Sequence, residues 1–342
     1  MKKTVFMTLI LLLCVASIVV GIMLLRKEGM RPHENPLDRI AKAFEGKFAK
    51  FEPTRGESVG LVRVFGAITF SESQGLFDAY PRGALRTIQE LERLREDRNV
   101  KAIVIQINSP GGTVGSVQEI CNQIHLAQQD GKKVVASVAD MAFSGGYYIA
   151  SACDEIVANP GSLTGSIGVI IVGADLQKLL NFIGVKFNVL KSGEHKDILA
   201  YWRDMTDEER NLLQTLIMDC YQQFVEAVSK GRNIPMDQLL GLADGRIFTG
   251  TQALDNHLID RFGTLDDAIN RAGELAGIEG KPNVVKPTVE PFERFFRFLD
   301  TKFGKTPSLT DIVSPECDSP IQYRANLGPA EAAFVYPTKS DQ

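Results

Sequence analysis

The sequence is poor in the residues that metal sites and disulfide frameworks require. Its four histidines show no ligand spacing, and no two cysteines form a close CxxC pair. The cysteines are scattered along the chain, at Cys14, Cys121, Cys153, Cys220 and Cys317. We therefore expect neither a zinc site nor a disulfide framework.

Positive charge is also scarce in any concentrated form. The net charge is -4, the isoelectric point is near 5.7, and the body of the chain has no long run of Lys or Arg. Surfaces that bind nucleic acids need clustered positive charge to displace counterions. We therefore expect no nucleic-acid partner.

What the sequence does contain is enough apolar material for a core. The chain has 342 residues, of which 44% are hydrophobic and 23% are charged, and it has no internal repeat. This composition predicts one large globular domain with appendages.

An uncharged apolar run occupies residues 5–25 and has basic residues on both flanks. A helix of about 20 apolar residues spans a bilayer, whereas the apolar part of a cleavable signal peptide is shorter. Cys14 does not indicate a lipoprotein, because leucines precede it where small residues are expected. We expect residues 1–27 to be an uncleaved, single-pass membrane anchor, whose orientation the flanking charges leave open.

Beyond a polar linker, residues 28–57, short β-branched runs alternate with stretches of helical spacing. This alternation predicts an α/β domain over residues 58–280, with a parallel sheet and right-handed crossovers. Strands are expected at residues 59–65, 102–107, 134–138, 156–158, 167–172 and 187–190. Helices are expected at residues 80–96, 117–129, 141–152, 175–182, 206–230 and 265–276.

The remaining segment, residues 281–342, is a tail in which prolines interrupt regular structure. Within it, apolar side chains share one face of a possible short amphipathic helix over residues 292–303. Such a helix docks on the core, on a neighbouring subunit or on a membrane surface.

A candidate nucleophile, Ser144, lies in the sequence Asp-Met-Ala-Phe-Ser-Gly-Gly-Tyr-Tyr, residues 140–148. It follows an expected strand and begins an expected helix, where free backbone N–H groups favour a developing oxyanion. A second glycine turn, Ser-Pro-Gly-Gly, ends at Gly112. The N–H of Gly145 and that of Gly111 or Gly112 are therefore candidates for an oxyanion hole. The plainer alternative is an N-cap serine beside tightly packed glycines.

A serine nucleophile needs a base, and no histidine lies between His125 and His195. Lysine serves this purpose where desolvation or a cationic neighbour lowers the pKa of its ammonium. Lys191 and Lys196 both lie in a polar loop, Lys-Ser-Gly-Glu-His-Lys-Asp. Composition alone does not choose between them, and a loop lysine is ordinarily a solvated surface charge.

Six ordered motifs resemble the signal peptide peptidase A family, the bacterial Ser-Lys proteases of family S49. The resemblance covers about residues 59–276. Its motifs are NSPGG (108–112), DMAFSGGYY (140–148), ANPGSLTGSIG (158–168), KSGEHKD (191–197), MTDEE (205–209) and ADGRIFTG (243–250).

The resemblance implies a Clp-crotonase fold, a parallel sheet built from repeated β-β-α units, and a Ser-Lys dyad. Ser144 would be the nucleophile, Lys196 the general base and Ser166 the hydroxyl that orients the lysine, with Gly111 and Gly145 as oxyanion donors. No metal or cofactor is implied. The expected substrates are apolar peptides, above all cleaved signal peptides.

The same resemblance implies a homo-oligomeric ring in which adjacent protomers share each site. Ser144 and Lys196 would then lie too far apart to interact within one chain. The expected location is the cytoplasmic (inner) membrane, with the catalytic domain on the periplasmic or extracytoplasmic side. Three alternatives stay open: a crotonase-type acyl-CoA enzyme, a non-catalytic anchored scaffold, and a related Ser-Lys protease that regulates membrane proteins.

Overall fold

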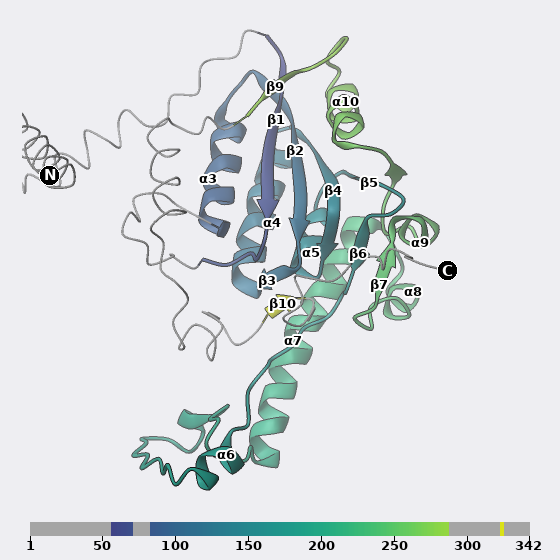
Figure 1. Ribbon diagram of the computed structural model, residues 1–342. Coiled ribbons are helices and arrows are strands. Elements are labelled where there is room, and N and C mark those ends of the chain that lie inside the picture. Colours follow the sequence, from purple (N-terminus) through teal and green to yellow (C-terminus); the bar gives the residue numbers. More distant parts are fainter. Residues whose placement is uncertain (1–55, 71–82, 287–321, 325–342) are drawn as a thin grey trace, which may run out of the picture. The chain divides into compact units, whose positions relative to one another are not determined.

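The computed structural model describes residues 56–70, 83–286 and 322–324 (Figure 1). The expected anchor, nearly all of the linker and the possible tail helix lie outside these ranges. Within the described ranges, no helix is both long and apolar enough to cross a bilayer.

The described residues form a mixed α/β fold around a mostly parallel, eight-stranded sheet. Six strands follow one another in the order β7-β6-β4-β2-β1-β9, and β5 pairs with β4 and β8. The strands of this sheet are β1 (Ser58–Phe65), β2 (Val100–Ser109), β4 (Lys133–Phe143), β5 (Glu155–Ala158), β6 (Leu163–Gly165), β7 (Ile247–Thr249), β8 (Arg261–Phe262) and β9 (Asn283–Val285). The antiparallel β6–β7 pair is the exception to the parallel arrangement. The predicted α/β class with a parallel sheet is confirmed.

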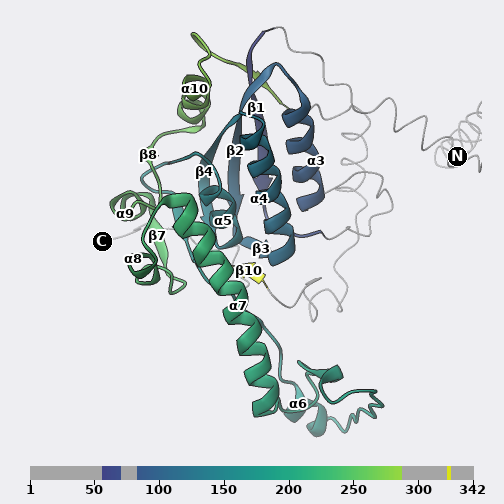
Figure 2. The same cartoon turned by 180° about the vertical axis from the view of Figure 1, so that it is seen from behind.

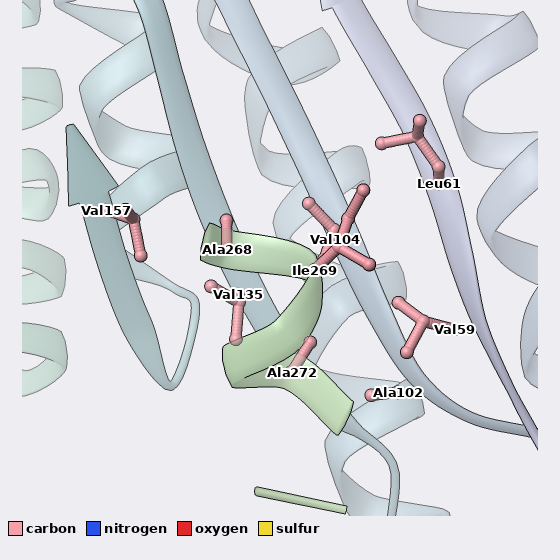
Figure 3. Close-up of a cluster of buried hydrophobic side chains, with 9 residues drawn as sticks. All are labelled: Val59, Leu61, Ala102, Val104, Val135, Val157, Ala268, Ile269 and Ala272. Atoms are coloured by element: carbon pink, nitrogen blue, oxygen red, sulfur yellow. The ribbon is translucent and has the colours of Figure 1, made fainter. Parts of the chain in front are cut away.

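Helices cover both faces of the sheet, so its central strands are apolar on both sides, as parallel strands usually are. On one face, α10 (Leu265–Leu275) packs Ala268, Ile269 and Ala272 against alternate residues of β1, β2, β4 and β5 (Figure 3). On the other face lie α3 (Gly83–Glu96), α4 (Val114–Gln129) and α5 (Gly145–Ser151). In β1 the alternation is direct: Val59 faces α10, whereas a Cβ on Gly60 would touch Leu94 of α3.

Strand β4 changes partners along its length, and this change creates the setting of the candidate site. Its first part, Val135 to Val138, pairs with β5, and its last part, Met141 to Phe143, pairs with β6. On its other side, Ala142 is opposite Ser109, the last residue of β2. The end of β4 is therefore flanked by the end of β2 and the end of β6.

Between β6 and α7 (Asp207–Arg232) the chain forms an arm, residues 172–206. The arm contains α6 (Gln177–Phe182) and the 3₁₀ turn η1 (Glu194–Asp197). In both views α6 lies at the end of α7 that points away from the sheet (Figures 1 and 2). The remaining described helices, α8 (Met236–Leu240) and α9 (Gly250–Asp255), lie near β7.

Two expected strands are absent, and one expected helix begins later than predicted. Residues 167–172 and 187–190 form no strand, and the strand in this region is β6, residues 163–165. Residues 141–143, expected to begin a helix, instead end β4, and the helix starts at Gly145. The two absent strands have β-branched, apolar sequences. Ile167 is fully buried without belonging to a strand, whereas Val172 and Leu190 are exposed.

Candidate active site

Ser144 occupies the turn between β4 and α5 in a strained backbone conformation. Its φ is +49° and its ψ is -113°, a combination that a residue with a side chain rarely adopts. Its carbonyl accepts from the N–H of Tyr148 (2.8 Å), which closes the first turn of α5. A sharp strand-to-helix turn of this kind presents a serine hydroxyl at the end of a sheet.

Ser166 lies directly beside this turn. Phe143 and Gly165 are partners in the β4–β6 register, so the next residue on each strand is a serine. The N–H of Ser144 donates to the carbonyl of Gly165 (2.9 Å), and Ser166 has a φ of +50°. The structure therefore brings these two predicted site residues together at adjacent strand ends.

The Ser144 hydroxyl is buried in the single chain. Its Oγ donates to the carbonyl of Gly168 at 3.3 Å, and the residue has no exposed surface. In this state the hydroxyl is held by a backbone carbonyl, and no base contacts it among the described hydrogen bonds.

The predicted oxyanion turn lies on the other side of Ser144. A Cβ on Gly146 would lie 3.2 Å from the carbonyl oxygen of Ser109, so the glycine turn packs directly on α5. Gly111 has a φ of +108°, and its N–H donates to Ser109 Oγ (3.1 Å). Gly145 is the first residue of α5, where backbone N–H groups have no acceptor within a helix. The N–H of Gly145 is thus the more available donor. The N–H of Gly111 could bind an oxyanion only by breaking or sharing its hydrogen bond to Ser109 Oγ.

A short strand from the tail lies against this turn. Strand β3 (Gly111–Thr113) pairs antiparallel with β10 (Gln322–Arg324), and Arg324 is opposite Gly111. Strand β10 also contacts α5, the helix that begins after Ser144. The edge of β3 therefore accepts an extended backbone next to the serine.

The two candidate lysines differ in their contacts. Lys191 Nζ donates to Asp197 Oδ1 (2.8 Å) and to the carbonyl of Glu194 (2.7 Å). Lys196 is exposed, and in the described part of the chain its amine has neither an ion pair nor a hydrogen bond. A base needs an amine that is not already donating to a carboxylate, which favours Lys196 over Lys191.

The structure does not bring Lys196 to Ser144 within one chain. Helix α7 separates them. Its C-terminal half packs on α5, where the rings of Phe224 and Tyr148 stack with their centroids 4.9 Å apart. Its N-terminus directly follows the arm. The arm, marked by α6, lies at the opposite end of α7 (Figures 1 and 2).

The described residues offer neither a reactive cysteine nor a metal centre as an alternative to Ser144. Burial raises the pKa of the Cys121 thiol to about 12 and also raises the pKa of Cys153, so both are poor thiolate sources. Within the same residues, no group of three or more His, Cys, Asp or Glu side chains could hold a metal ion.

Sequence reasoning missed a charged cluster in the arm that consists of Asp197, Arg203 and Glu209. The available signal was the Thr-x-x-Glu pattern at Thr206–Glu209, which is typical of a capping box. The structure contains this capping box at the start of α7.

Comparison with known proteins defines the class. The sequence model of the peptidase family S49 matches residues 126–279, which relates the chain to peptidases. It is 43% identical over 229 residues to the putative protease slr0021 of Synechocystis sp., covering 67% of this chain and 78% of that protein.

Two further relatives agree. A putative signal peptide peptidase SppA of Enterococcus faecium is 32% identical over 267 residues, 77% of this chain and 76% of that protein. A chloroplastic serine protease SPPA of Arabidopsis thaliana is 34% identical over 226 residues, 65% of this chain and 33% of that protein. The chain belongs to peptidase family S49.

Proposed function

We propose that the protein is a membrane-anchored serine endopeptidase that uses Ser144 as nucleophile and Lys196 as general base. The observation that carries this proposal is the strained turn at Ser144, which lies between the glycine turn of β3 and Ser166. The glycine turn offers backbone N–H donors for an oxyanion, and Ser166 offers a second hydroxyl.

In the proposed reaction, the uncharged amine of Lys196 takes the proton of the Ser144 hydroxyl as its oxygen attacks a peptide carbonyl. The N–H groups of Gly145 and Gly111 stabilise the oxyanion of the tetrahedral intermediate. The protonated lysine then donates to the leaving amine, and an acyl-enzyme forms. Water, activated by the same amine, attacks the acyl-enzyme and releases Ser144. Ser166 accepts or donates a hydrogen bond that orients the lysine.

The dyad forms between two copies of the chain. Large apolar side chains of the arm are exposed in the single chain, with Phe182 at 88% and Leu190 at 101%. Further exposed members of this surface are Val172, Leu179, Ile183, Val185, Phe187, Val189 and Tyr201. Large exposed apolar side chains in this number on one segment are typical of an interface. A neighbouring copy that covers the arm would place its Ser144 beside this chain's Lys196 and would remove the amine from water.

Peptide substrates would bind in extended form along the edge of β3. Strand β10 of the tail takes this place in the structure and shows that backbone pairing at Gly111–Thr113 is sterically allowed. Backbone pairing gives affinity without strong sequence demands. This suits a peptidase that degrades varied apolar peptides.

The expected anchor, residues 5–25, supports cleaved signal peptides as substrates, because it would hold the site near the bilayer in which such peptides remain. One relative bears the name putative signal peptide peptidase. We place the catalytic domain on the periplasmic or extracytoplasmic side of the cytoplasmic membrane.

The test is a peptidase assay on a synthetic signal peptide with the full-length protein in detergent. Ser144→Ala and Lys196→Ala should each abolish cleavage. If sites are shared, co-expression of the two inactive chains restores about one quarter of the wild-type activity, because a site is intact only where the two different chains adjoin in the required order.

A mixture without activity would overturn the shared site but not the dyad. Full activity of Lys196→Ala would overturn the dyad itself. Covalent labelling of wild type but not of Ser144→Ala by a fluorophosphonate provides an independent control for the nucleophile.

A further inference from the structure

The arm contains a network of charged groups next to the proposed base. Asp197, the residue after Lys196, is only 10% exposed at its side chain, although residues 184–194 before it are exposed. Its Oδ1 accepts from Arg203 Nη2 (2.7 Å) and Lys191 Nζ (2.8 Å), and its Oδ2 accepts from Arg203 Nε (3.0 Å). Arg203 and Lys191 together hold the pKa of the Asp197 carboxyl well below its usual range.

Arg203 also reaches the start of α7. Its Nη1 donates to Glu209 Oε2 (2.9 Å), and the Glu209 side chain is 3% exposed. Glu209 in turn closes the capping box, since its Oε2 accepts from the N–H of Thr206 (3.0 Å). One guanidinium therefore links the lysine loop to the first turn of a 26-residue helix.

The lysine loop needs such a link because little else holds it. It is a single 3₁₀ turn with no buried residue, and the described backbone bonds around it are local, such as Lys196 N–H to the carbonyl of Gly193 (3.2 Å). A general base must sit within hydrogen-bond reach of its proton, and small displacements cost rate. Planar, bidentate Arg–carboxylate pairs give the required geometric precision.

We propose that Arg203 is a positioning residue for Lys196 and acts through Asp197. It has two effects. First, it attaches the loop containing Lys196 to α7. Second, it pairs with the Asp197 carboxylate, so that this carboxylate does not pair with Lys196 and keep the lysine in its cationic form. The inference rests on the proposed Ser-Lys function.

The charged groups around this loop are Lys191, Glu194, Asp197, Arg203 and Glu209. In addition, the Nε2 atom of His195 lies 3.7 Å from Glu208 Oε1, on α7. The Asp197 carboxylate is thus opposed by two cations and Glu209 by one, all within hydrogen-bond distance. Loss of Arg203 would leave two carboxylates with Lys191 as the nearest remaining donor.

The experiment measures kcat, KM and their pH dependence with full-length Arg203→Gln in detergent. We expect kcat to fall about 10- to 100-fold with KM changed less than about twofold, because positioning acts on the chemical step. The acid limb of the kcat profile should move to higher pH by about one unit, because a freed carboxylate favours the ammonium form of a nearby lysine. Arg203→Lys, which keeps the charge but loses the planar fork, should recover part of the rate.

The dependence on Asp197 is tested with the double variant Arg203→Gln/Asp197→Asn. The acid limb should return to its wild-type position, because no freed carboxylate remains, while kcat stays low. An acid limb that stays shifted in the double variant would overturn the proposed route through Asp197.

Arg271→Gln is the matched control. Arg271 makes a bidentate pair with Glu155 in the body of the protein and has the same exposure, 25% against 26% for Arg203. We expect its kcat and pH profile to equal those of wild type. If Arg203→Gln behaves like Arg271→Gln while Lys196→Ala is inactive, the inference fails and the dyad stands. If Lys196→Ala is active, the dyad itself fails.

Discussion

The sheet body and the arm are built from similar residue types but bury them in opposite ways. In the body, β-branched residues such as Ile103, Ile105 and Val135 have no exposed surface. In the arm, Val172, Ile183 and Leu190 are more than half exposed. Apolar composition alone therefore does not distinguish a core strand from an exposed segment.

The two regions also differ in what holds them together. The body is stabilised by side chains packed between a sheet and helices on both faces. The arm is stabilised by one aromatic cluster and one charged network, namely Trp202 stacked on Phe187 (5.1 Å) and Arg203 paired with Asp197 and Glu209. The arm thus keeps its shape with little buried apolar area of its own.

The sharpest test of this difference is the same substitution in both regions. Ile105→Ala should lower the free energy of unfolding by about 2–5 kcal/mol, because it removes buried contacts and leaves a cavity. Ile183→Ala, at a side chain that is 57% exposed in the single chain, should change it by less than about 0.5 kcal/mol in dilute protein. Urea unfolding in detergent measures both values.

Equal losses for the two variants at low protein concentration would show that the arm is part of the core. A loss for Ile183→Ala that appears only at high concentration would instead support its burial between copies, because association makes apparent stability concentration-dependent.

The same contrast explains what the sequence predicted and what it did not. Strands at residues 59–65, 102–107 and 156–158 were predicted because their apolar runs are buried on both faces of the sheet. Residues 167–172 and 187–190 have similar runs but no sheet to join, so the predicted strands are absent. The end of β4 was missed because Met141 to Phe143 shows no strand alternation that separates it from the helix that follows.

For the site, sequence motifs led to Ser144, Ser166 and the glycine turn, and the structure places these at neighbouring strand ends. Sequence reasoning did not find Arg203, because the Thr-x-x-Glu pattern indicates a capping box at Glu209 but gives no sign that Glu209 and Asp197 both pair with an arginine between them. It also did not find the pairing of β10 with β3, since a tail strand of three residues has no pattern of its own.

The exposed apolar side chains of the arm allow a second test. If copies of the chain associate through the arm, as proposed, Leu190→Asp should dissociate them, because a charge placed in an apolar interface weakens association by about 2 kcal/mol or more, about thirtyfold. Peptidase activity should fall with it if adjacent copies share each site. Sedimentation velocity in detergent, alongside the peptide assay, measures both effects.

Leu240→Asp is the control for that substitution. Leu240 is also exposed, at 48%, but it lies on α8 in the body. Its assembly and activity should match wild type. If both variants remain assembled and active, the arm is not the interface.

The smallest expected effect is a pH response of the arm. Arg203 lowers the pKa of Glu209 to about 2 and lowers the pKa of Asp197 as well. A carboxyl whose pKa is lowered on folding contributes stability above its ordinary pKa of about 4, and this contribution is lost as the pH falls through the lowered value. The arm should therefore keep its structure from pH 8 to about 5 and lose it between about 4 and 2.

The single tryptophan of the chain, Trp202, reports on this change because it stacks within the arm beside Arg203. Its fluorescence should stay constant down to about pH 5 and change below about pH 4. In Arg203→Gln the change should be smaller, because carboxyls whose pKa values return towards their ordinary range no longer contribute pH-dependent stability. Arg271→Gln, which breaks an equivalent pair in the body, should leave the Trp202 transition where it is in wild type. Coincident transitions in all three proteins would mean that Arg203 does not stabilise the arm. The structure of the arm would then not depend on its charged network.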